Sequence, residues 1–372
     1  MGALLAQPRW MTHNRKQENQ VPALDNGEWV WGLRAVIYQL KQMKGYDVLL
    51  QRYQNYFDML AKNVVMIFYD GEGLVRAVTQ IRDTQASPVR RNYFQQRPCG
   101  RPCYLDDPYE GEMITFFMYL YGDWNGREQG PEKLWVVKRP KLQAVNFQVN
   151  PQQNITVQRG WWFSAHEQWK YLELPYLDSS INRRVFLNGE RARSWNSVIN
   201  GYPGMFASVN DVATPPSLVI PDYLSSVGIP SIAFEEVTKY TTITPYGCFP
   251  LFLTGNRGVA LSWYLTMLQG PSMQGPFGST EACNVTGTAV SPVLTWDAKI
   301  TTFAAMIGGM SDITRAALQE DGLYNQFLQR VDNEWNLKFG GDVLQGEDLP
   351  FQIPNTRVPY PSSLGDFSTC QV

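Results

Sequence analysis

Two carboxylates in this sequence stand where a loop enters an apolar helix, a place where charge is costly. In the first such stretch, Asp107, Pro108 and Glu110 read as the cap, the first residue and the third residue of a helix. Residues 113–121 are apolar on almost every side, which is typical of a helix buried all round. Glu112 would then lie one turn inside a buried helix, where desolvation favours the neutral form that a general acid needs. Pairing with an arginine is the structural alternative.

The second carboxylate is Asp297, which follows a loop rich in glycine and proline between residues 275 and 292. Apolar residues recur at helical spacing from Ile300 to Ile307, so Asp297 stands at a helix entrance as Glu112 does. Trp296 places an aromatic ring next to this carboxylate. A helix cap is the structural alternative, because capping is a common role for an aspartate at this position.

Composition excludes several classes of protein. The chain of 372 residues carries 32 basic and 34 acidic residues, so the electrostatic footprint of a nucleic-acid binder is missing. No apolar run is long enough to span a membrane, and we find no linker at which to divide the chain, which predicts one domain over residues 1–372. The five cysteines do not have metal-site spacing, and a local disulfide between Cys99 and Cys103 is expected. Aromatic residues make up 13% of the chain, and some could serve as platforms for sugars.

Helical periodicity dominates the first part of the chain. The box Asp25 to Glu28 predicts the start of a helix that continues to Leu40. A second amphipathic helix over 49–60 would make an antiparallel hairpin with it. The apolar runs 64–69 and 74–81, on either side of a glycine-containing turn, predict a small β-hairpin.

A second informative stretch begins at Trp161. Ser164 and Glu167 have capping-box spacing, and a cap is the structural alternative to a binding role for Glu167. His166 is one of only two histidines, and we interpret it as a ligand-binding residue rather than a catalyst. Further helices are expected over 179–200 with an interruption near Gly189, over 256–270, 300–307 and 324–335, and the tail from 340 is expected to be extended. Antiparallel helices with carboxylates and aromatic rings at their entrances predict an all-α toroid.

Several motifs, taken in order, resemble the eukaryotic endo-β-1,2-glucanases and, more distantly, bacterial β-1,2-glucanases and glucoamylase-like proteins. The resemblance runs from about Pro22 to Phe339. It implies an (α/α)6 barrel, hydrolysis of linear β-1,2-glucan to short sophoro-oligosaccharides with inversion, no metal or other cofactor, and secretion. The motifs are 23–27 (ALDNG), 69–72 (YDGE), 107–112 (DPYEGE), 164–170 (SAHEQWK), 275–281 (GPFGSTE) and 296–297 (WD).

The same resemblance bears on the N-terminus. Related proteins carry a helical hairpin before the Asp-Asn-Gly motif, whereas this chain has only about two dozen residues there. The opening residues are too short and too soon followed by Pro8 and Arg9 for a signal peptide. We therefore expect a truncated N-terminus and an exposed apolar edge on the barrel.

An inverting glycosidase needs one protonated carboxyl and one carboxylate, roughly 6.5–9.5 Å apart, the second of which activates water. Glu112 is interpreted as the acid and Asp297 as the base, with proton relays through a substrate hydroxyl or ordered water implied by the resemblance. A one-turn error in the predicted helix start would exchange Glu112 and Glu110. The residues expected to bind substrate are Glu110, Tyr109, Trp162, His166, Glu167, Trp169, Lys170, Glu281 and Trp296.

Two other functions remain open at this stage. A related barrel enzyme could transfer β-1,2-glucosyl groups to another sugar, and a barrel without catalysis could simply bind the glucan. The sequence does not separate them, because the difference lies in how water is held at Asp297. The expected partner is β-1,2-glucan, for a monomer that binds neither nucleic acid nor membrane.

Overall fold

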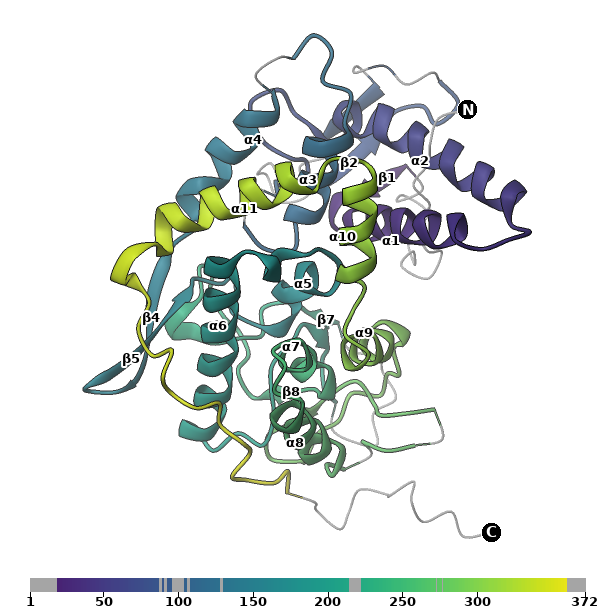
Figure 1. The fold of residues 1–372 in the computed structure, drawn as a ribbon. Helices are drawn as coiled ribbons and strands as arrows, with labels where there is room; N and C mark the ends of the chain where they lie inside the picture. The colour runs from purple at the N-terminus through teal and green to yellow at the C-terminus, as the bar shows by residue number, and fades with distance from the viewer. Residues whose placement is uncertain are drawn as a thin grey trace, which may run out of the picture. The chain divides into compact units, whose positions relative to one another are not determined.

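The computed structural model describes residues 19–86, 89, 92–95, 104–105, 108–127, 130–213, 222–271, 273–275 and 277–359. The model is 51% helical with only short strands, which confirms the all-α class. The chain divides into two compact units (Figure 1). Unit 1 comprises Met1–Leu142, Glu173–Pro175 and Met310–Arg330, and unit 2 comprises Gln143–Leu172, Tyr176–Gly309 and Val331–Val372. Asp107, Cys99 and Cys103 lie outside the described residues, and the predicted disulfide with them.

Helix α1 (Ala23–Lys41) is the centre of unit 1. It packs against α2 (Asp47–Phe68), α3 (Glu112–Tyr121) and α10 (Ser311–Glu320), so the predicted helical hairpin is confirmed (Figure 1). Gly27 explains the close fit of α1 on α3, because a Cβ there would lie 2.7 Å from the backbone nitrogen of Ile114. The remaining helix of the unit is α4 (Gly130–Lys138), and α11 (Tyr324–Phe339) begins in it.

Two predicted helix starts in unit 1 are wrong. Helix α1 begins at Ala23 with Pro22 in the cap position, so Asp25 is in the first turn instead of before it. Helix α3 begins at Glu112, four residues later than predicted. The preceding residues form tight turns, in which the N–H of Glu112 donates to the Tyr109 carbonyl at 3.0 Å. A capping pattern is compatible with helix starts a few residues apart. The start of α3 is set by its packing against Gly27 of α1, a contact between segments that are distant in the sequence.

The predicted β-hairpin over 64–69 and 74–81 is confirmed at its turn, where Tyr69 and Val75 form an antiparallel bridge, but its first strand is wrong. Residues 64–68 are the last turns of α2, where Val64, Val65 and Phe68 fill the buried face. A short apolar run rich in β-branched residues fits a strand or a buried helix equally well. The second half of the prediction survives as β2 (Val78–Ile81), which lies antiparallel between β1 (Gln20–Pro22) and β3 (Tyr93–Gln95).

Unit 2 is built around α6 (Ser180–Ile199), which packs against the hairpin of β4 (Ala144–Asn150) and β5 (Gln153–Gln158) (Figure 1). Helix α6 is continuous, so the predicted interruption at Gly189 is wrong. Gly189 is buried in this helix facing Phe163. The other elements are η5 (Ala165–Gln168), α5 (Trp169–Glu173), η6 (Tyr176–Asp178), β6 (Val209–Asn210), β7 (Tyr223–Leu224), η7 (Pro230–Ile232), β8 (Thr242–Ile243), η8 (Pro245–Cys248), α7 (Phe249–Leu253), α8 (Arg257–Leu268), β9 (Cys283–Asn284), α9 (Trp296–Met306) and η9 (Gly341–Val343), with η4 (Arg139–Lys141) in unit 1.

The tail from residue 340 was predicted to be extended, but it begins with η9 and contains a turn closed by Leu349 N–H and the Gly346 carbonyl at 3.2 Å. The rest of its described part has neither helix nor strand. Backbone carbonyls of this tail accept hydrogen bonds from indoles of unit 2. Trp195 Nε1 donates to Pro350 O at 3.1 Å, and Trp263 Nε1 donates to Gln352 O at 2.8 Å. The tail is therefore part of the folded unit.

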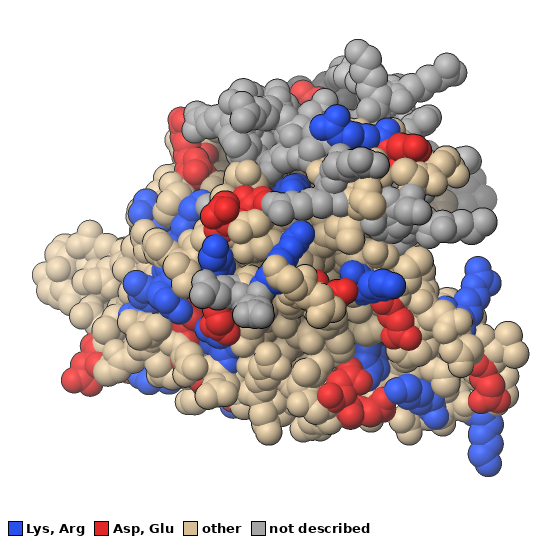
Figure 2. Space-filling model, turned by 90° about the horizontal axis from the view of Figure 1, so that it is seen from above, with Lys and Arg blue, Asp and Glu red and all other residues tan. Residues whose placement is uncertain are grey.

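Charges of both signs are interspersed on the face seen in Figure 2, among larger areas of uncharged residues. In the described residues, no helix is both long enough and apolar enough to cross a bilayer.

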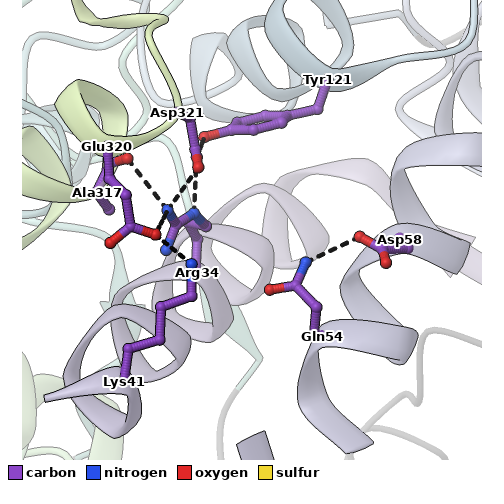
Figure 3. A network of polar contacts seen from close by, with 8 residues as sticks. All are labelled: Arg34, Lys41, Gln54, Asp58, Tyr121, Ala317, Glu320 and Asp321. Carbon is purple, nitrogen blue, oxygen red and sulfur yellow. Dashed lines mark hydrogen bonds and ion pairs between the residues drawn. The ribbon is translucent and has the colours of Figure 1, made fainter. Parts of the chain in front are cut away.

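An ion pair with one buried partner joins α1, the end of α3 and the end of α10 in unit 1 (Figure 3). The guanidinium of Arg34 on α1 is 3% exposed and donates to both carboxylate oxygens of Asp321, each at 2.8 Å. Tyr121 at the end of α3 donates its hydroxyl to the same carboxylate at 2.5 Å. Burial and the nearby Asp321 raise the pKa of Tyr121, so the phenol stays protonated as a donor.

We expect Asp321→Ala to lower the free energy of unfolding by about 1.5–3 kcal/mol, the range for hydrogen bonds to charged groups. Buried Arg34 keeps two weaker partners, the Glu320 carboxylate at 3.5 Å and the Ala317 carbonyl at 3.1 Å, but it loses both hydrogen bonds to Asp321. Asp312→Ala is the matched control, because its pair with Arg315 is on the surface, with Asp312 88% exposed. Such a pair contributes about 0–1 kcal/mol. Urea denaturation of both variants measures the difference, and equal losses would contradict the role given to Asp321.

Candidate active site

The loop before η5 is held by one buried carboxylate. Glu167 Oε1 accepts hydrogen bonds from the backbone N–H of Trp162 at 2.8 Å, of Phe163 at 2.6 Å and of Ser164 at 3.3 Å. The predicted return of Glu167 to the Ser164 N–H is thereby confirmed. Burial raises the pKa of Glu167, while Arg193 and these N–H groups lower it. Glu167 therefore shapes the loop, and its predicted contact with substrate stays a prediction.

The same loop is strained at Phe163, whose φ of 58° is rare for a residue with a side chain. Arg193 packs on the Phe163 ring and is itself held by Glu190. The Arg193 guanidinium lies 4.6 Å from the centre of the Phe163 ring, and Arg193 Nε donates to Glu190 Oε1 at 3.0 Å. The backbone of Trp162 packs directly against Gly228. A Cβ at position 228 would lie 1.8 Å from the Trp162 carbonyl oxygen, so only glycine fits there. Half-buried Trp162 therefore sits on a rigid backbone.

His166 and Trp169 meet at the hydroxyl of Tyr246 on η8. His166 Nδ1 lies 2.9 Å from Tyr246 Oη, and Trp169 Nε1 lies 3.3 Å from the same oxygen. Burial lowers the pKa of His166 to about 4, with Asp297 acting in the opposite direction, so the imidazole is neutral near pH 7. The structure thus brings two predicted site residues together and places the Asp297 charge within electrostatic reach of them.

Asp297 is exposed in the first turn of α9. The helix begins at Trp296, and the cap position is Thr295, so the alternative that Asp297 caps the helix is wrong. The ring of Trp296 is 76% exposed. An exposed carboxylate next to an exposed indole can meet a sugar and a water molecule together.

A cavity of about 160 Å³ lies beside this helix start and contains the buried carboxylate of Glu281. That carboxylate accepts from the backbone N–H of Asn210 at 3.1 Å and from its Nδ2 at 2.8 Å. Burial raises the pKa of Glu281, Asn210 lowers it, and Asp297 raises it further. Lys299 also lines the cavity. Burial lowers the pKa of Lys299, while the nearby charges of Glu281 and Asp297 act to raise it. The volume is well above the roughly 10–15 Å³ that a water needs.

Lys170 is only 1% exposed. Its ammonium lies over three aromatic rings, at 5.4 Å from Tyr171, 4.7 Å from Tyr176 and 4.6 Å from Trp335. Such an arrangement stabilises a buried cation through the ring quadrupoles. A sugar contact by Lys170 stays a prediction.

The remaining predicted residues belong to unit 1. Tyr109 is 4% exposed, and Glu112, the first residue of α3, is 1% exposed. Glu110 is half-buried in the turn before the helix. The sequence placed Glu110 as the third residue of this helix, and that placement is wrong because α3 begins after it.

Sequence reasoning missed three residues of this site: Tyr246, Asn210 and Lys299. Pro245 before Tyr246 was a signal for a helix start. It gave no sign that the Tyr246 hydroxyl contacts His166, 80 residues away in the sequence. Among the described residues, no group of three or more His, Cys, Asp and Glu could hold a metal ion.

Carboxylates, a neutral histidine and indoles, of which Trp296 is exposed, stand at the entrances of helices, an arrangement that fits a glycoside hydrolase with a helical scaffold. The family model described as endo-β-1,2-glucanase SGL matches residues 5–371, so the chain belongs to that family. No curated protein matches the chain in sequence.

Solved structures agree with this membership. An endo-β-1,2-glucanase from Talaromyces funiculosus in complex with sophorose is 40% identical, with a TM-score of 0.89, covering 96% of this chain and 72% of that one. A mutant of the enzyme from the same organism, in complex with β-1,2-glucan, is 39% identical, with the same TM-score and coverage. A β-1,2-glucanase from Parabacteroides distasonis shares the fold at 12% identity, with a TM-score of 0.55, covering 84% of this chain and 45% of that one.

Proposed function

We propose that this chain cleaves linear β-1,2-glucan internally with inversion and releases sophoro-oligosaccharides. Membership of the endo-β-1,2-glucanase family makes it a glycoside hydrolase that acts on this glucan. The observation that carries the proposal is the likeness to the Talaromyces enzyme, described in complex with β-1,2-glucan and with sophorose, over 96% of the chain. Inversion, product length, secretion and a monomer that binds neither nucleic acid nor membrane belong to the proposal. So does a single (α/α)6 barrel domain.

Asp297 is proposed as the base that activates water. Water can reach Asp297 because the residue is exposed. Its charge interacts with those of Glu281 and Lys299. Glu112 is proposed as the acid, with Glu110 as a substrate-binding residue. The exposed Trp296 and half-buried Trp162, His166 and Trp169 are proposed to bind the sugar chain.

Incubation with purified linear β-1,2-glucan tests the function. We expect new reducing ends, linear sophoro-oligosaccharides and, by NMR at early times, the α-anomer at the new end, because inversion turns a β-linkage into an α-hydroxyl. Linear β-1,3-glucan is the matched control polymer. Cyclic or elongated products would mean glucosyl transfer, and binding without new reducing ends would mean a glucan-binding protein. Either result would contradict the proposal.

A further inference from the structure

The loop over residues 160–164 holds half-buried Trp162 next to a costly backbone conformation. Phe163 has a φ of 58°, which a residue with a side chain adopts only where its surroundings enforce it. The loop is also tightly closed, because a Cβ at Gly160 would lie 2.5 Å both from Glu167 Oε2 and from the Cα of Phe163. Strained backbone of this kind clusters at functional sites, so the groups that enforce it are candidates for a functional role.

Glu167 anchors this loop best while its carboxyl is ionised. One oxygen accepts the backbone N–H groups of residues 162–164, and the side chain is 4% exposed. Several N–H donors stabilise a carboxylate in its charged form, and a protonated carboxyl has less acceptor capacity. Burial acts in the opposite direction and raises the pKa of Glu167. The anchor therefore depends on a nearby cation to stay charged.

Arg193 on α6 is that cation. Its side chain is 4% exposed, and its guanidinium lies 4.6 Å from the centre of the Phe163 ring. It acts against burial to lower the pKa of Glu167. Arg193 Nε donates to Glu190 Oε1 at 3.0 Å, one turn away on the same helix, so the charge is held in place. One side chain thus touches the strained residue and acts on its anchor.

We propose that Arg193 is a positioning residue for glucan binding, because it packs on Phe163, balances the charge of Glu167 and so holds the 160–164 loop in the conformation that presents Trp162. The inference rests on the proposed function in one respect, the binding of the sugar chain by Trp162. A loop that adopts its competent conformation for only a fraction of the time binds more weakly by that fraction. Loss of Arg193 should therefore weaken binding and leave the chemical step little changed.

Arg193→Met tests this role through KM for β-1,2-glucan. Methionine is unbranched and can still fill space beside Phe163, but it carries no charge. Without the cation, Glu167 takes up its proton at a higher pH, so the anchor is lost as the pH falls. We expect KM relative to wild type to rise about tenfold at about pH 5, as when the competent conformation falls to about a tenth, and less at about pH 8. Arg193→Lys keeps the charge and should restore KM.

Arg191→Met is the matched control on the same helix. The Arg191 guanidinium lies 4.9 Å from the centre of the Phe351 ring, and its Nε donates to the Leu349 carbonyl at 3.0 Å, so it contacts the C-terminal tail instead of the loop. Its loss should lower Tm without changing KM. A rise in KM that is equal at every pH, or an equal rise in the Arg191→Met protein, would overturn the inference, because a general loss of stability would explain either result.

A double variant covers the case in which Arg193→Met alone is too unstable. Burial raises the pKa of Glu190 to about 7, opposed by Arg193, and Arg193→Met/Glu190→Gln leaves no lone charge at this position. The double variant should show the same pH-dependent rise in KM. An unchanged KM in a folded double variant would overturn the inference.

Infrared difference spectroscopy tests the same network without turnover. The band of protonated Glu167 is identified by its loss in Glu167→Gln. We expect this band to appear at a higher pH in Arg193→Met or the double variant than in the wild type, and an unchanged pH would overturn the inference. A wild-type protein that releases no reducing ends would contradict the proposed function alone, because the infrared result does not depend on hydrolysis.

Discussion

Asp297→Asn is expected to abolish hydrolysis while leaving the stability of the protein nearly unchanged. The amide keeps the shape of the side chain but cannot accept the proton of the attacking water, and general base catalysis is typically worth ~10²–10⁴-fold. Because Asp297 is exposed and Thr295 holds the cap position of α9, the substitution removes no helix cap. Reducing-end assays on β-1,2-glucan measure kcat, and thermal denaturation measures Tm.

Asp312→Asn is the matched control for this experiment. Asp312 is also exposed and is also the second residue of its helix, α10. The same amide substitution at the same helical position should leave activity and Tm unchanged. Full hydrolytic activity in a stable Asp297→Asn protein would refute the assignment and move the base to another acid, of which Glu281 is the first candidate.

Glu112→Gln is expected to fold and to bind oligosaccharide but to lose ~10²–10⁴-fold in kcat. The amide is nearly isosteric with the carboxyl and has no proton to deliver to the leaving oxygen. Titration calorimetry with a sophoro-oligosaccharide measures binding, and reducing-end assays measure turnover. Retained binding with lost turnover separates a catalytic role from damage to the fold.

Glu110→Gln is the partner variant, because it makes the same change two residues away. If Glu112 is the acid, Glu110→Gln should keep turnover and mainly weaken binding. Structure makes this comparison sharper, since α3 begins at Glu112 and leaves Glu110 half-buried in the turn before it. An inactive Glu110→Gln protein beside an active Glu112→Gln protein would assign the acid to Glu110.

Local patterns in the sequence were enough for the elements whose stability depends on their own periodicity. The pairing of α1 with α2, helix α8 and the entrance of α9 at Trp296 follow the sequence prediction, although the exact ends of α1 and α2 do not. Each of these depends on neighbours three or four residues away, which a sequence displays directly. The order of short motifs also predicted the family that the comparisons show.

Side-chain surroundings were decided only by tertiary structure. The start of α3 and the end of α2 depend on packing between helices, and capping signals or apolar runs fit several registers. The capping box of Glu167 was visible in the sequence, but its bonds to the N–H groups of Trp162 and Phe163, and the place of Lys170 among aromatic rings, were not. Tyr246 contacts a histidine 80 residues away in the sequence. Burial and hydrogen-bond partners come from segments distant in the chain, so no local pattern specifies them.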